Sequence, residues 1–412
     1  MSVEQVYAAP GNPGIGEVGK CIEINPTDIT GLAKFAADHN IDLTVVGPEQ
    51  PLALGIVDAF REKDLRIFGP NTDAAQVETS KTYAKQVCLK NRIPSPRWNV
   101  YGDSKDAIAA LDEYGPPWVV KADGLAAGKG TTVTRDKKEA VDAVRREIKR
   151  SPGQVILEEF IEGWEATFMA TISGGRIQWL TPVFQDYKPA YDDDTGPNTG
   201  GMGCFSPVPE VSDSLIRRVR ESILEPMING LRRDGVNYQG ILNLNAIVKR
   251  ETGEPMVLEF NARFGDPECQ GVMSLVDGGL ANHISQVADN IHSTKSPDCK
   301  PSTACVVVVV ASKGYPTGQE IGDKITLRPV IKPNVRLFHA GTSRDRTGGL
   351  VTAGGRVLNI AATGPNLESA RNNAYATIRQ AVHFEGMQYR TDIGLPSRPG
   401  RRLQQEQLTR TL

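Results

Sequence analysis

The stretch from Trp118 to Thr134 constrains the fold of this chain most. It reads WVVKADGLAAGKGTTVT, an apolar segment ending in Lys121, a glycine-rich loop that contains Lys129, and a second β-branched segment. Backbone N–H groups in such a loop can close around a phosphate because no Cβ blocks the approach, and the two lysines add positive charge. We therefore expect two antiparallel strands whose connecting loop covers a nucleotide phosphate. An ordinary hairpin with a flexible tip is the alternative.

This loop differs from the Walker phosphate loop. The Walker pattern needs glycine, four residues, Gly-Lys-Ser/Thr and then a helix. Here Asp123 stands at the first glycine and Gly130 stands at the hydroxyl position, and the run Thr131–Thr134 favours a strand over a helix. The expected nucleotide site is therefore a hairpin and not a strand–loop–helix unit.

Length and composition indicate a globular protein that acts on small molecules. The 412 residues allow two to four domains, at about 100 to 200 residues each. The hydrophobic fraction of 39% and charged fraction of 23% are ordinary for a globular protein. A net charge of −2 gives no electrostatic reason to expect nucleic acid or a membrane surface as the partner.

Cysteine usage and the amino terminus point to the cytoplasm. The six cysteines are scattered, without a CxxC pair or a Cys/His cluster, so neither a disulfide framework nor a zinc site is indicated. No apolar stretch approaches the roughly 20 residues of a membrane span. The start MSVEQVYAAP lacks the charged and apolar regions of a signal peptide.

The first part of the chain reads as an α/β domain over residues 1–98. Strand-like and helix-like pieces alternate up to about residue 75, with helices near 28–39 and 52–63, which predicts a parallel sheet. Gly47-Pro48-Glu49 follows one predicted strand, at the sheet edge where such folds bind ligands. Loop punctuation explains these residues equally well. Ser80 is expected to cap a helix that runs to about Asn91.

Two further domains are expected. Residues 99–300 contain the hairpin, a helix introduced by a capping box at Asp136–Glu139, further strands at 155–160 and 166–172, a helix at 212–230, strands at 240–248 and 255–260, and a largely helical segment at 270–292. Residues 117–185 form a small subdomain that carries the loop. Residues 301–396 are strand-rich, and residues 397–412 read as a disordered tail.

A strand that ends in Glu259-Phe260-Asn261 offers a metal site. Alternation along a strand places Glu259 and Asn261 on one face. Two oxygen ligands side by side suit Mg²⁺, which takes its remaining ligands from water and substrate phosphates. A simple strand end explains the pair as well, but Arg263, Asp266 and Glu268 follow within seven residues of Asn261 and add a cation and two carboxylates.

A long polar loop at residues 185–203 offers a second site. QDYK at 185–188 and DTGPNTGGMG at 194–203 are rich in glycine and polar side chains. A loop of this length buries little, so function is its usual justification. Its carboxylates suit an ammonium group and its backbone amides suit a carboxylate, as a small amino acid requires. An ordinary surface Ω-loop is the alternative.

Over nearly its whole length the chain resembles the phosphoribosylamine–glycine ligase family of the ATP-grasp superfamily. Nine blocks in the family's order carry the resemblance: VVGPEQPL (45–52), IFGP (67–70), VVKADGLAAGKG (119–130), QDYK (185–188), DTGPNTGGMG (194–203), LEFNARFGDPE (258–268), FHAGT (338–342), GGRVL (354–358) and YRTDIG (389–394). The implied fold is α/β and α+β: an ATP-grasp domain between a Rossmann-like amino-terminal domain and a strand-rich carboxy-terminal domain.

The resemblance also implies roles for individual residues. The ATP phosphates are assigned to Lys81, Lys121, Gly128, Lys129 and Gly130, adenine to Glu158, Phe160 and Ile161, and ribose to Glu165. The metal is assigned to Glu259 and Asn261, and catalytic stabilisation of the transferred phosphoryl group to Arg263, Lys121 and Lys129. The amino acid falls to Asp186, Lys188, Asp194, Pro197, Asn198, Thr199, Gly200 and Gly201, and the phosphoribosylamine to Gly47, Pro48, Glu49 and Asp266.

The implied reaction joins glycine to 5-phosphoribosylamine in purine biosynthesis. Glycine is first phosphorylated by ATP, with Mg²⁺ or Mn²⁺, and the amine then displaces phosphate from glycyl phosphate. Both reactive species need shelter from water, which predicts a mobile lid. We expect a cytoplasmic monomer without nucleic-acid or membrane partners. The five histidines receive no catalytic role.

Two departures from the family qualify this interpretation. Family members begin with an additional strand and a Gly-rich turn before a segment like VYAAPGNPG (6–14), so we expect the chain as written to be poorly stable and inactive. Leu242–Ala246 reads LNLNA where the family has LYAGL, which places two asparagines near the metal site. A related ligase for another amino acid or amine, and an inactive nucleotide-binding remnant, therefore remain alternatives.

Overall fold

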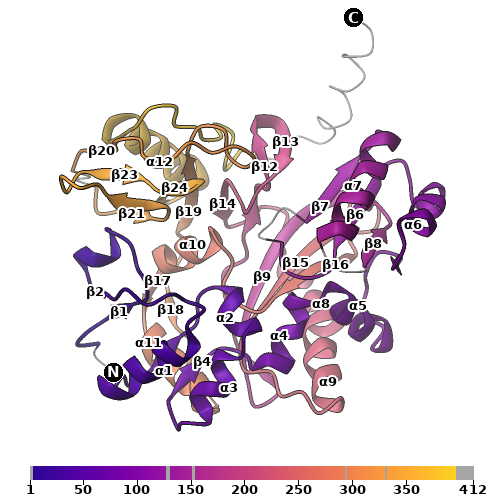
Figure 1. The fold of residues 1–412 in the computed structure, drawn as a ribbon, viewed down its shortest axis with the longest axis horizontal. Helices are drawn as coiled ribbons and strands as arrows, with labels where there is room; N and C mark the ends of the chain where they lie inside the picture. Colours follow the sequence, from indigo (N-terminus) through magenta and orange to yellow (C-terminus); the bar gives the residue numbers. More distant parts are fainter. Residues whose placement is uncertain (1–2, 127–129, 151–153, 293–294, 330–331, 396–412) are drawn as a thin grey trace, which may run out of the picture.

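The computed structural model describes residues 3–126, 130–150, 154–292, 295–329 and 332–395. Three bodies surround a central four-stranded sheet (Figure 1). The amino-terminal region, in indigo, lies at the bottom, the small sheet with α6 and α7 stands at the upper right, and the carboxy-terminal region, in yellow, lies at the upper left.

The amino-terminal region contains parallel strand pairs, as predicted. β1 (Tyr7–Ala8) pairs with β2 (Lys20–Cys21), and β3 (Thr44–Val45) pairs with β4 (Ile67–Phe68). In the described part of the chain these pairs form two separate two-stranded sheets. The helices are α1 (Ile29–Asp38), α2 (Glu49–Ala53), α3 (Ile56–Arg61) and α4 (Thr72–Thr79).

The single helix expected at 52–63 is wrong. Gly55 takes φ +80° between α2 and α3, a left-handed conformation that ends one helix before the next begins. The helix expected near 28–39 is confirmed as α1, whose cap is the Asp28 carboxylate accepting from the Gly31 N–H.

The hairpin predicted at Trp118–Thr134 is confirmed. β6 (Trp118–Ala122) and β7 (Thr131–Thr134) are antiparallel, with Lys121 opposite Thr131. β8 (Val155–Glu158) and β5 (Trp98–Tyr101) extend the sheet in the order β5-β8-β6-β7. The helices α6 (Ser104–Ala110) and α7 (Lys137–Arg150) pack small and β-branched side chains against this sheet, including Ala140 and Val144. These four strands and two helices form a small body, which is called the lid below.

The capping box expected at the start of α7 is wrong. The Asp136 carboxylate accepts from the Lys138 N–H at 2.8 Å, and the Glu139 carboxylate accepts from the Thr134 hydroxyl. The Thr134 hydroxyl also accepts from the Asp136 N–H, because it lies at the end of β7 within reach of both groups. A side chain from the preceding strand therefore takes the place of the reciprocal box.

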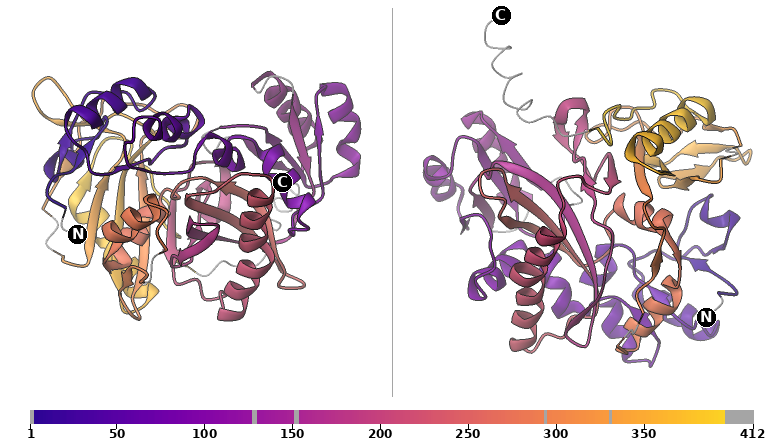
Figure 2. Two further views of the ribbon diagram at one scale, coloured as in Figure 1. Left: turned by 90° about the horizontal axis from the view of Figure 1, so that it is seen from below. Right: turned by 180° about the vertical axis from the view of Figure 1, so that it is seen from behind.

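The central sheet has the order β10-β9-β15-β16. Its strands are β9 (Gly163–Ser173), β10 (Arg176–Leu180), β15 (Gly240–Lys249) and β16 (Pro255–Asn261). α5 (Lys81–Lys90), α8 (Asp213–Val219) and α9 (Glu225–Arg233) contribute to the same core, which includes Phe168, Leu244 and Met227. The ribbon seen from behind shows the helical segment 213–233 running beside this sheet (Figure 2, right). A π-helical turn at Arg220–Leu224 joins α8 to α9, so the helix expected at 212–230 is continuous but not regular.

The carboxy-terminal sheet has the order β11-β14-β19-β24-β21. The buried strand expected after Ser302 is confirmed as β19 (Ala304–Ala311), which pairs with β24 (Arg356–Gly364) and is covered by α12 (Leu367–Ala381). β11 (Gln185–Asp186) and β14 (Gly203–Ser206) extend the sheet past β19. The sheet therefore crosses the boundary expected near residue 301, and the loop 185–203 starts and ends on it.

The segment expected to be largely helical at 270–292 is interrupted. α10 (Glu268–Leu275) and α11 (Leu280–Ala288) flank the short strand β17 (Val276–Gly278), which pairs with β18 (Asp298–Cys299). The remaining elements are the 3₁₀ turns Ile15–Glu17, Leu111–Glu113 and Asp192–Asp194, and the strands β12 (Pro189–Tyr191), β13 (Thr195–Asn198), β20 (Thr326–Leu327), β21 (Val335–His339), β22 (Thr342–Arg344), β23 (Leu350–Thr352) and β25 (Val382–His383).

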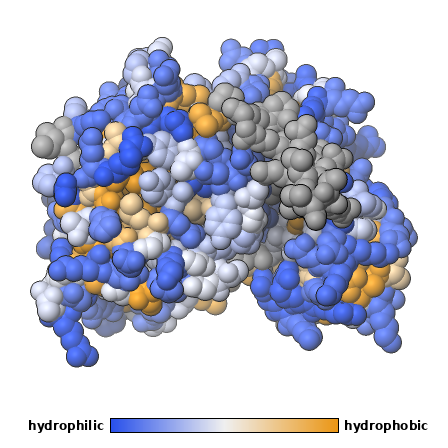
Figure 3. All heavy atoms as spheres, turned by 90° about the horizontal axis from the view of Figure 1, so that it is seen from above, coloured by the Kyte–Doolittle hydropathy of each residue, from blue (hydrophilic) through white to orange (hydrophobic). Residues whose placement is uncertain are grey.

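Hydrophilic side chains cover most of the face seen from above, and apolar side chains form patches between them (Figure 3). Among the described helices, none combines the length and the apolar character that a membrane crossing requires.

Candidate active site

A cleft of about 1040 Å³ lies between the three bodies. Its size suits a nucleotide together with a second small molecule. Most of the residues assigned from the sequence line it: Gly47, Pro48, Glu49, Lys81, Lys121, Gly130, Glu158, Phe160, Ile161, Glu165, Asp186, Lys188, Asp194, Asn198, Thr199, Gly200, Glu259, Asn261, Arg263 and Asp266. Pro197 and Gly201 are absent from the described lining, and Gly128 and Lys129 lie outside the described residues.

A buried cluster of two lysines and one glutamate joins the sheet of the lid to α5. The Lys121 ammonium lies 2.5 Å from the Glu158 carboxylate, and the Lys85 ammonium lies 2.8 Å from it on the other oxygen. The three side chains come from β6, β8 and α5, and each is buried. Lys121 also donates to the Leu258 carbonyl at 3.1 Å. One carboxylate thus holds two cations, and the cluster keeps a net positive charge.

The base of the phosphate loop is tied to the start of α5. Lys81 donates to the Gly124 carbonyl at 3.0 Å, and the Asp123 carboxylate accepts from the Thr82 N–H at 3.2 Å. Ser80 caps the helix by accepting from the Tyr83 N–H, as predicted. Burial lowers the pKa of Lys81, while Glu259 opposes that shift. The hairpin and the α5 terminus are therefore joined by the side chains of Lys81 and Asp123.

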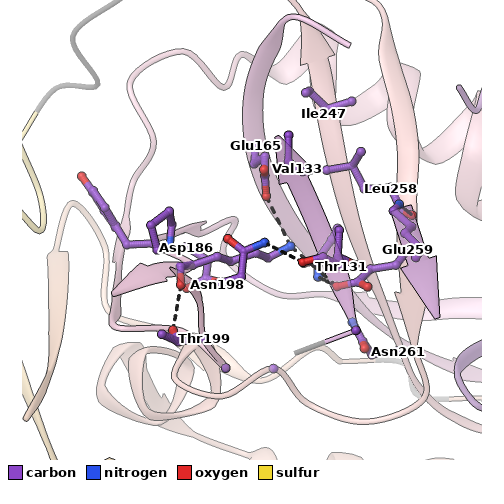
Figure 4. A pocket seen from close by; sticks show the side chains of 18 of the residues that line it. Thr131, Val133, Glu165, Asp186, Asn198, Thr199, Ile247, Leu258, Glu259 and Asn261 are labelled. Carbon is purple, nitrogen blue, oxygen red and sulfur yellow. Dashed lines mark hydrogen bonds and ion pairs between the residues drawn. The ribbon is translucent and has the colours of Figure 1, made fainter. Parts of the chain in front are cut away.

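Glu259 and Asn261 project from the end of β16 on the same face, as predicted (Figure 4). Asn245 lies opposite Glu259 on β15 and donates to its carboxylate at 2.9 Å. Burial would raise the pKa of Glu259, but Lys188, Lys81 and Lys121 lower it to about 2. A carboxylate held in its charged form beside an amide oxygen fits a divalent cation.

The sequence departure at Leu242–Ala246 touches this site. Asn243 lies opposite Asn261, and Asn245 lies opposite Glu259. The Asn245 amide oxygen accepts from the Thr167 hydroxyl at 3.0 Å, so this side chain links Glu259 to Thr167. The asparagines therefore orient the predicted metal ligand.

Two further carboxyl groups, those of Asp186 and Glu268, line the same cleft. Burial raises the pKa of Asp186 well above its usual value, and the neighbouring Glu268 raises it further. Burial also raises the pKa of Glu268, whose carboxylate lies 3.0 Å from the Thr167 hydroxyl oxygen. One oxygen of Asp186 is buried without a hydrogen-bond partner among the described residues. A pair of this kind suits an ammonium group.

Lys188 lies two residues after Asp186 in the sequence and contacts Glu259, one of the two predicted metal ligands. Its ammonium lies 3.3 Å from Glu165 and 3.6 Å from Glu259. Burial alone would lower its pKa, but Glu165, Glu259 and Asp186 together raise it. Glu165, which the sequence assigns to ribose, thus also pairs with Lys188, which the sequence assigns to the amino acid.

The loop 194–203 contacts both the lid and the carboxy-terminal region. The Asn198 amide donates to the Thr131 carbonyl of β7 at 3.4 Å, and Thr199 donates to the Lys188 carbonyl at 2.8 Å. The Arg356 guanidinium donates to the Gly200 carbonyl at 2.9 Å and pairs with Asp266 at 2.8 Å. The loop is thereby fixed beside the cleft.

The Arg263 guanidinium lies between two carboxylates of the amino-terminal region. It is 3.3 Å from Glu49 and 3.2 Å from Glu78, and Glu78 also accepts from the Ala262 N–H at 2.7 Å. Burial opposes charge on Arg263, but Glu78 and Glu49 raise its pKa. The cation assigned to the phosphoryl group thus also joins the central sheet to the amino-terminal region.

Sequence reasoning missed several residues of this site. Lys85 stands one helical turn after Lys81, and that i, i+4 spacing on a predicted helix is a signal that could have found it. Arg356 lies in the matched block GGRVL but received no role. No local pattern identified Glu78, because its partners Arg263 and Ala262 are distant in the sequence.

Comparison with protein families gives three matches in chain order. Residues 1–78 match the N domain of phosphoribosylglycinamide synthetase, residues 79–269 match its ATP-grasp (A) domain, and residues 305–396 match its C domain.

Curated relatives and solved structures agree with these matches. The chloroplastic phosphoribosylamine–glycine ligase of Arabidopsis thaliana is 40% identical over 95% of this chain and 75% of its own length. That of Caldanaerobacter subterraneus is 39% identical over 95% of this chain and 93% of its own length. The phosphoribosylamine–glycine ligase structure from Thermotoga maritima, at 31% identity, covers 94% of this chain and 93% of its own with a TM-score of 0.80. The biotin carboxylase domain of the Hydrogenobacter thermophilus 2-oxoglutarate carboxylase, at 15% identity, covers 93% of this chain and 86% of its own with a TM-score of 0.71, which shows a shared fold.

Proposed function

The chain belongs to the phosphoribosylamine–glycine ligase family, and from that premise we propose that its cleft uses ATP to join glycine to 5-phosphoribosylamine. The product is glycinamide ribonucleotide, with ADP and phosphate, in purine biosynthesis. The single observation that carries the proposal is the position of Glu259, which lines the cleft at the end of β16, 3.6 Å from the Lys188 ammonium and in the same cleft as Lys81 and Lys121. A cation site at this point would touch both the nucleotide and the amino acid.

The nucleotide is assigned to the lid side of the cleft. Lys81 and Lys121 supply positive charge for the phosphates, and the segment Phe160–Ile161 lines the part of the cleft assigned to adenine. Glu165 lines the same cleft and is the candidate for the ribose hydroxyls. Because phosphoryl transfer needs little covalent help from the protein, placement and charge neutralisation are the main contributions of these residues.

Glu259 and Asn261 are the candidate ligands of a divalent cation, Mg²⁺ or Mn²⁺. When bound, such a cation neutralises phosphate charge and orients the transferred group. The Asn245 amide fixes one carboxylate oxygen of Glu259 at 2.9 Å.

Asp186 and Glu268 are the candidate ammonium site for glycine. An ammonium between the two carboxyl groups would compensate the charge that burial disfavours, so the site favours an amino acid over a simple acid. Lys188 lies beside this pair and suits the glycine carboxylate as it attacks the γ-phosphate. Glycyl phosphate is then the intermediate, and the amine of phosphoribosylamine displaces phosphate to form the amide.

The phosphoribosylamine is assigned to the side formed by Gly47–Glu49 and Asp266, which line the same cleft. We also propose a monomer as the working unit, a state that light scattering would test. The six free cysteines favour a reducing compartment, the cytoplasm. Fractionation of the native organism would test this location.

The deciding experiment measures ADP release by the purified chain with glycine and phosphoribosylamine supplied together or singly. ADP release that requires both substrates is expected. Release with another amino acid or amine would favour a related ligase, and ADP binding without turnover would favour a nucleotide-binding remnant. Lys121→Ala should raise the KM for ATP at least tenfold, whereas the control Lys137→Ala, on the exposed face of the lid, should leave it unchanged.

A further inference from the structure

We infer that Arg390, which lies outside the cleft, is a positioning residue for amino-acid binding because it holds the turn at Asp192–Asp194 beside the site. This inference rests on the proposed function. The turn lies in the loop that carries Asp186 and Lys188 at one end and Asn198 at the other. The guanidinium comes from the carboxy-terminal region, far along the chain.

Arg390 is the largest fully buried side chain of the described residues, with 1% of its surface exposed. Its guanidinium pairs with Asp194 at 2.9 Å and with Asp392 at 2.6 Å, and it donates to the Pro189 carbonyl at 3.1 Å. A buried arginine is costly unless its donors are used in this way. Since Asp194 lines the cleft and Arg390 does not, the arginine acts on the site through the loop.

The same guanidinium also holds the strand that leads into the turn. It lies 4.6 Å from the centre of the Tyr187 ring, and Tyr187 donates to the Leu395 carbonyl at 3.0 Å. Asp186, Tyr187 and Lys188 all line the cleft. Anchoring Tyr187 against Arg390 and the Leu395 carbonyl therefore fixes the backbone from which Asp186 and Lys188 extend.

The backbone of the turn needs support. Asp193 and Asp194 both take φ +57°, a left-handed conformation that is unfavourable for residues with a side chain. The Asp193 N–H donates to Asp392 at 3.0 Å, and the Thr391 N–H donates to Asp192 at 2.7 Å. Three successive aspartates are thus each tied to the segment 390–392.

Arg390→Met tests this arrangement because methionine keeps much of the apolar volume and removes the charge. Hydrogen–deuterium exchange of the free protein should become at least tenfold faster for amides at 189–198 and stay unchanged for β6 and β8. The KM for glycine should rise at least tenfold, while the KM for ATP stays within twofold. Ile360→Ala is the control, because Ile360 lies on β24 in the hydrophobic core of the same region and carries no charge.

A control with an equal loss of thermal stability separates positioning from folding. If Ile360→Ala raises the KM for glycine as much as Arg390→Met does, the inference is overturned. If Arg390→Met folds and leaves both the exchange at 189–198 and the KM for glycine unchanged, it is overturned as well.

Asp194→Asn supplies a second variant on a half-exposed residue that should fold normally. If Asp194 acts through Arg390, the double variant should raise the KM for glycine no more than the larger single change. If the two residues act independently, the two effects should multiply, and that result contradicts the inference. Absence of glycine-dependent turnover in the unaltered chain would defeat the proposed function alone, because the exchange measurement still decides whether Arg390 orders the loop.

Discussion

Glu158→Gln is expected to destabilise the lid more than any single change on its surface. The substitution leaves the buried ammonium groups of Lys85 and Lys121 facing a neutral amide in place of a carboxylate at 2.8 Å and 2.5 Å. With an effective dielectric constant of about 20, each of these ion pairs corresponds to roughly 6 kcal/mol of direct attraction. Desolvation offsets much of this, and removal of one partner from a buried pair typically costs about 3–5 kcal/mol.

A second substitution sharpens the prediction. In Glu158→Gln/Lys85→Met one of the two uncompensated cations is gone, while Lys121 keeps its bond to the Leu258 carbonyl. The double variant should recover about 2 kcal/mol relative to Glu158→Gln, because the remaining penalty is that of a single buried charge. Lys85→Met alone should cost less than Glu158→Gln, since Glu158 keeps Lys121.

Native-state hydrogen exchange of the β6 and β8 amides measures the free energy of opening of the lid in each variant. Lys137→Met is the matched control, because it removes an exposed pair with Asp112 at 2.6 Å and should cost less than about 1 kcal/mol. A cost below about 1 kcal/mol for Glu158→Gln, or a double variant no more stable than Glu158→Gln, would refute the reasoning.

Three further changes test the rest of the cleft. Glu259→Gln should abolish metal-dependent ADP release. Because the pKa of Glu259 in the folded protein is lowered to about 2, the ionised carboxylate should stabilise the fold fully above about pH 5 and lose this effect as the pH falls toward 2. A stability difference between the two proteins that stays constant down to pH 2 in acid titrations would contradict this. Asp186→Asn should raise the KM for glycine roughly 30-fold, which corresponds to the loss of one hydrogen bond to a charged group. Because burial raises the pKa of Asp186 in the folded protein, the same change should raise the thermal stability of the free protein at pH 7 to 8 relative to wild type. A loss of stability in calorimetry would count against the buried pair of carboxyl groups. Gly201→Ala should lower the melting temperature more than Gly235→Ala does. Both residues have positive φ, but only at Gly201 would a Cβ lie 2.7 Å from the Pro267 ring and 3.0 Å from an Asp186 oxygen. Equal losses in thermal melts would show that the neighbouring atoms move to relieve this contact.

Local patterns predicted the parts of the fold that depend on local physics. The alternation at Glu259 and Asn261 predicted a shared face, and the β-branched run after Gly130 predicted the second strand of the hairpin. The capping role of Ser80 followed from residue type and position alone. These features need only the chain within a few residues of themselves.

The parts that sequence reasoning missed depend on partners far along the chain. Lys85 meets Glu158 across 73 residues, and Arg390 meets Asp194 across 196. The residues that neighbour Lys85 and Arg390 in the sequence do not indicate that Glu158 and Asp194 will lie beside them in the fold. The capping box failed for a related reason, because the Thr134 hydroxyl, contributed by the end of β7, reaches the same backbone and carboxylate groups.

The sheet that joins β11 and β14 to β19 sets a limit on how genes of this kind can be cut and recombined. A fragment that begins near residue 301 would lose the strand that covers one edge of β19 and would expose its run of valines, an open edge that invites aggregation. Exchange of the carboxy-terminal region between relatives should therefore succeed only when residues 185–206 travel with it. The loop at 185–203 and the carboxy-terminal region should then be exchanged between relatives as one unit, although about 100 residues of sequence separate them.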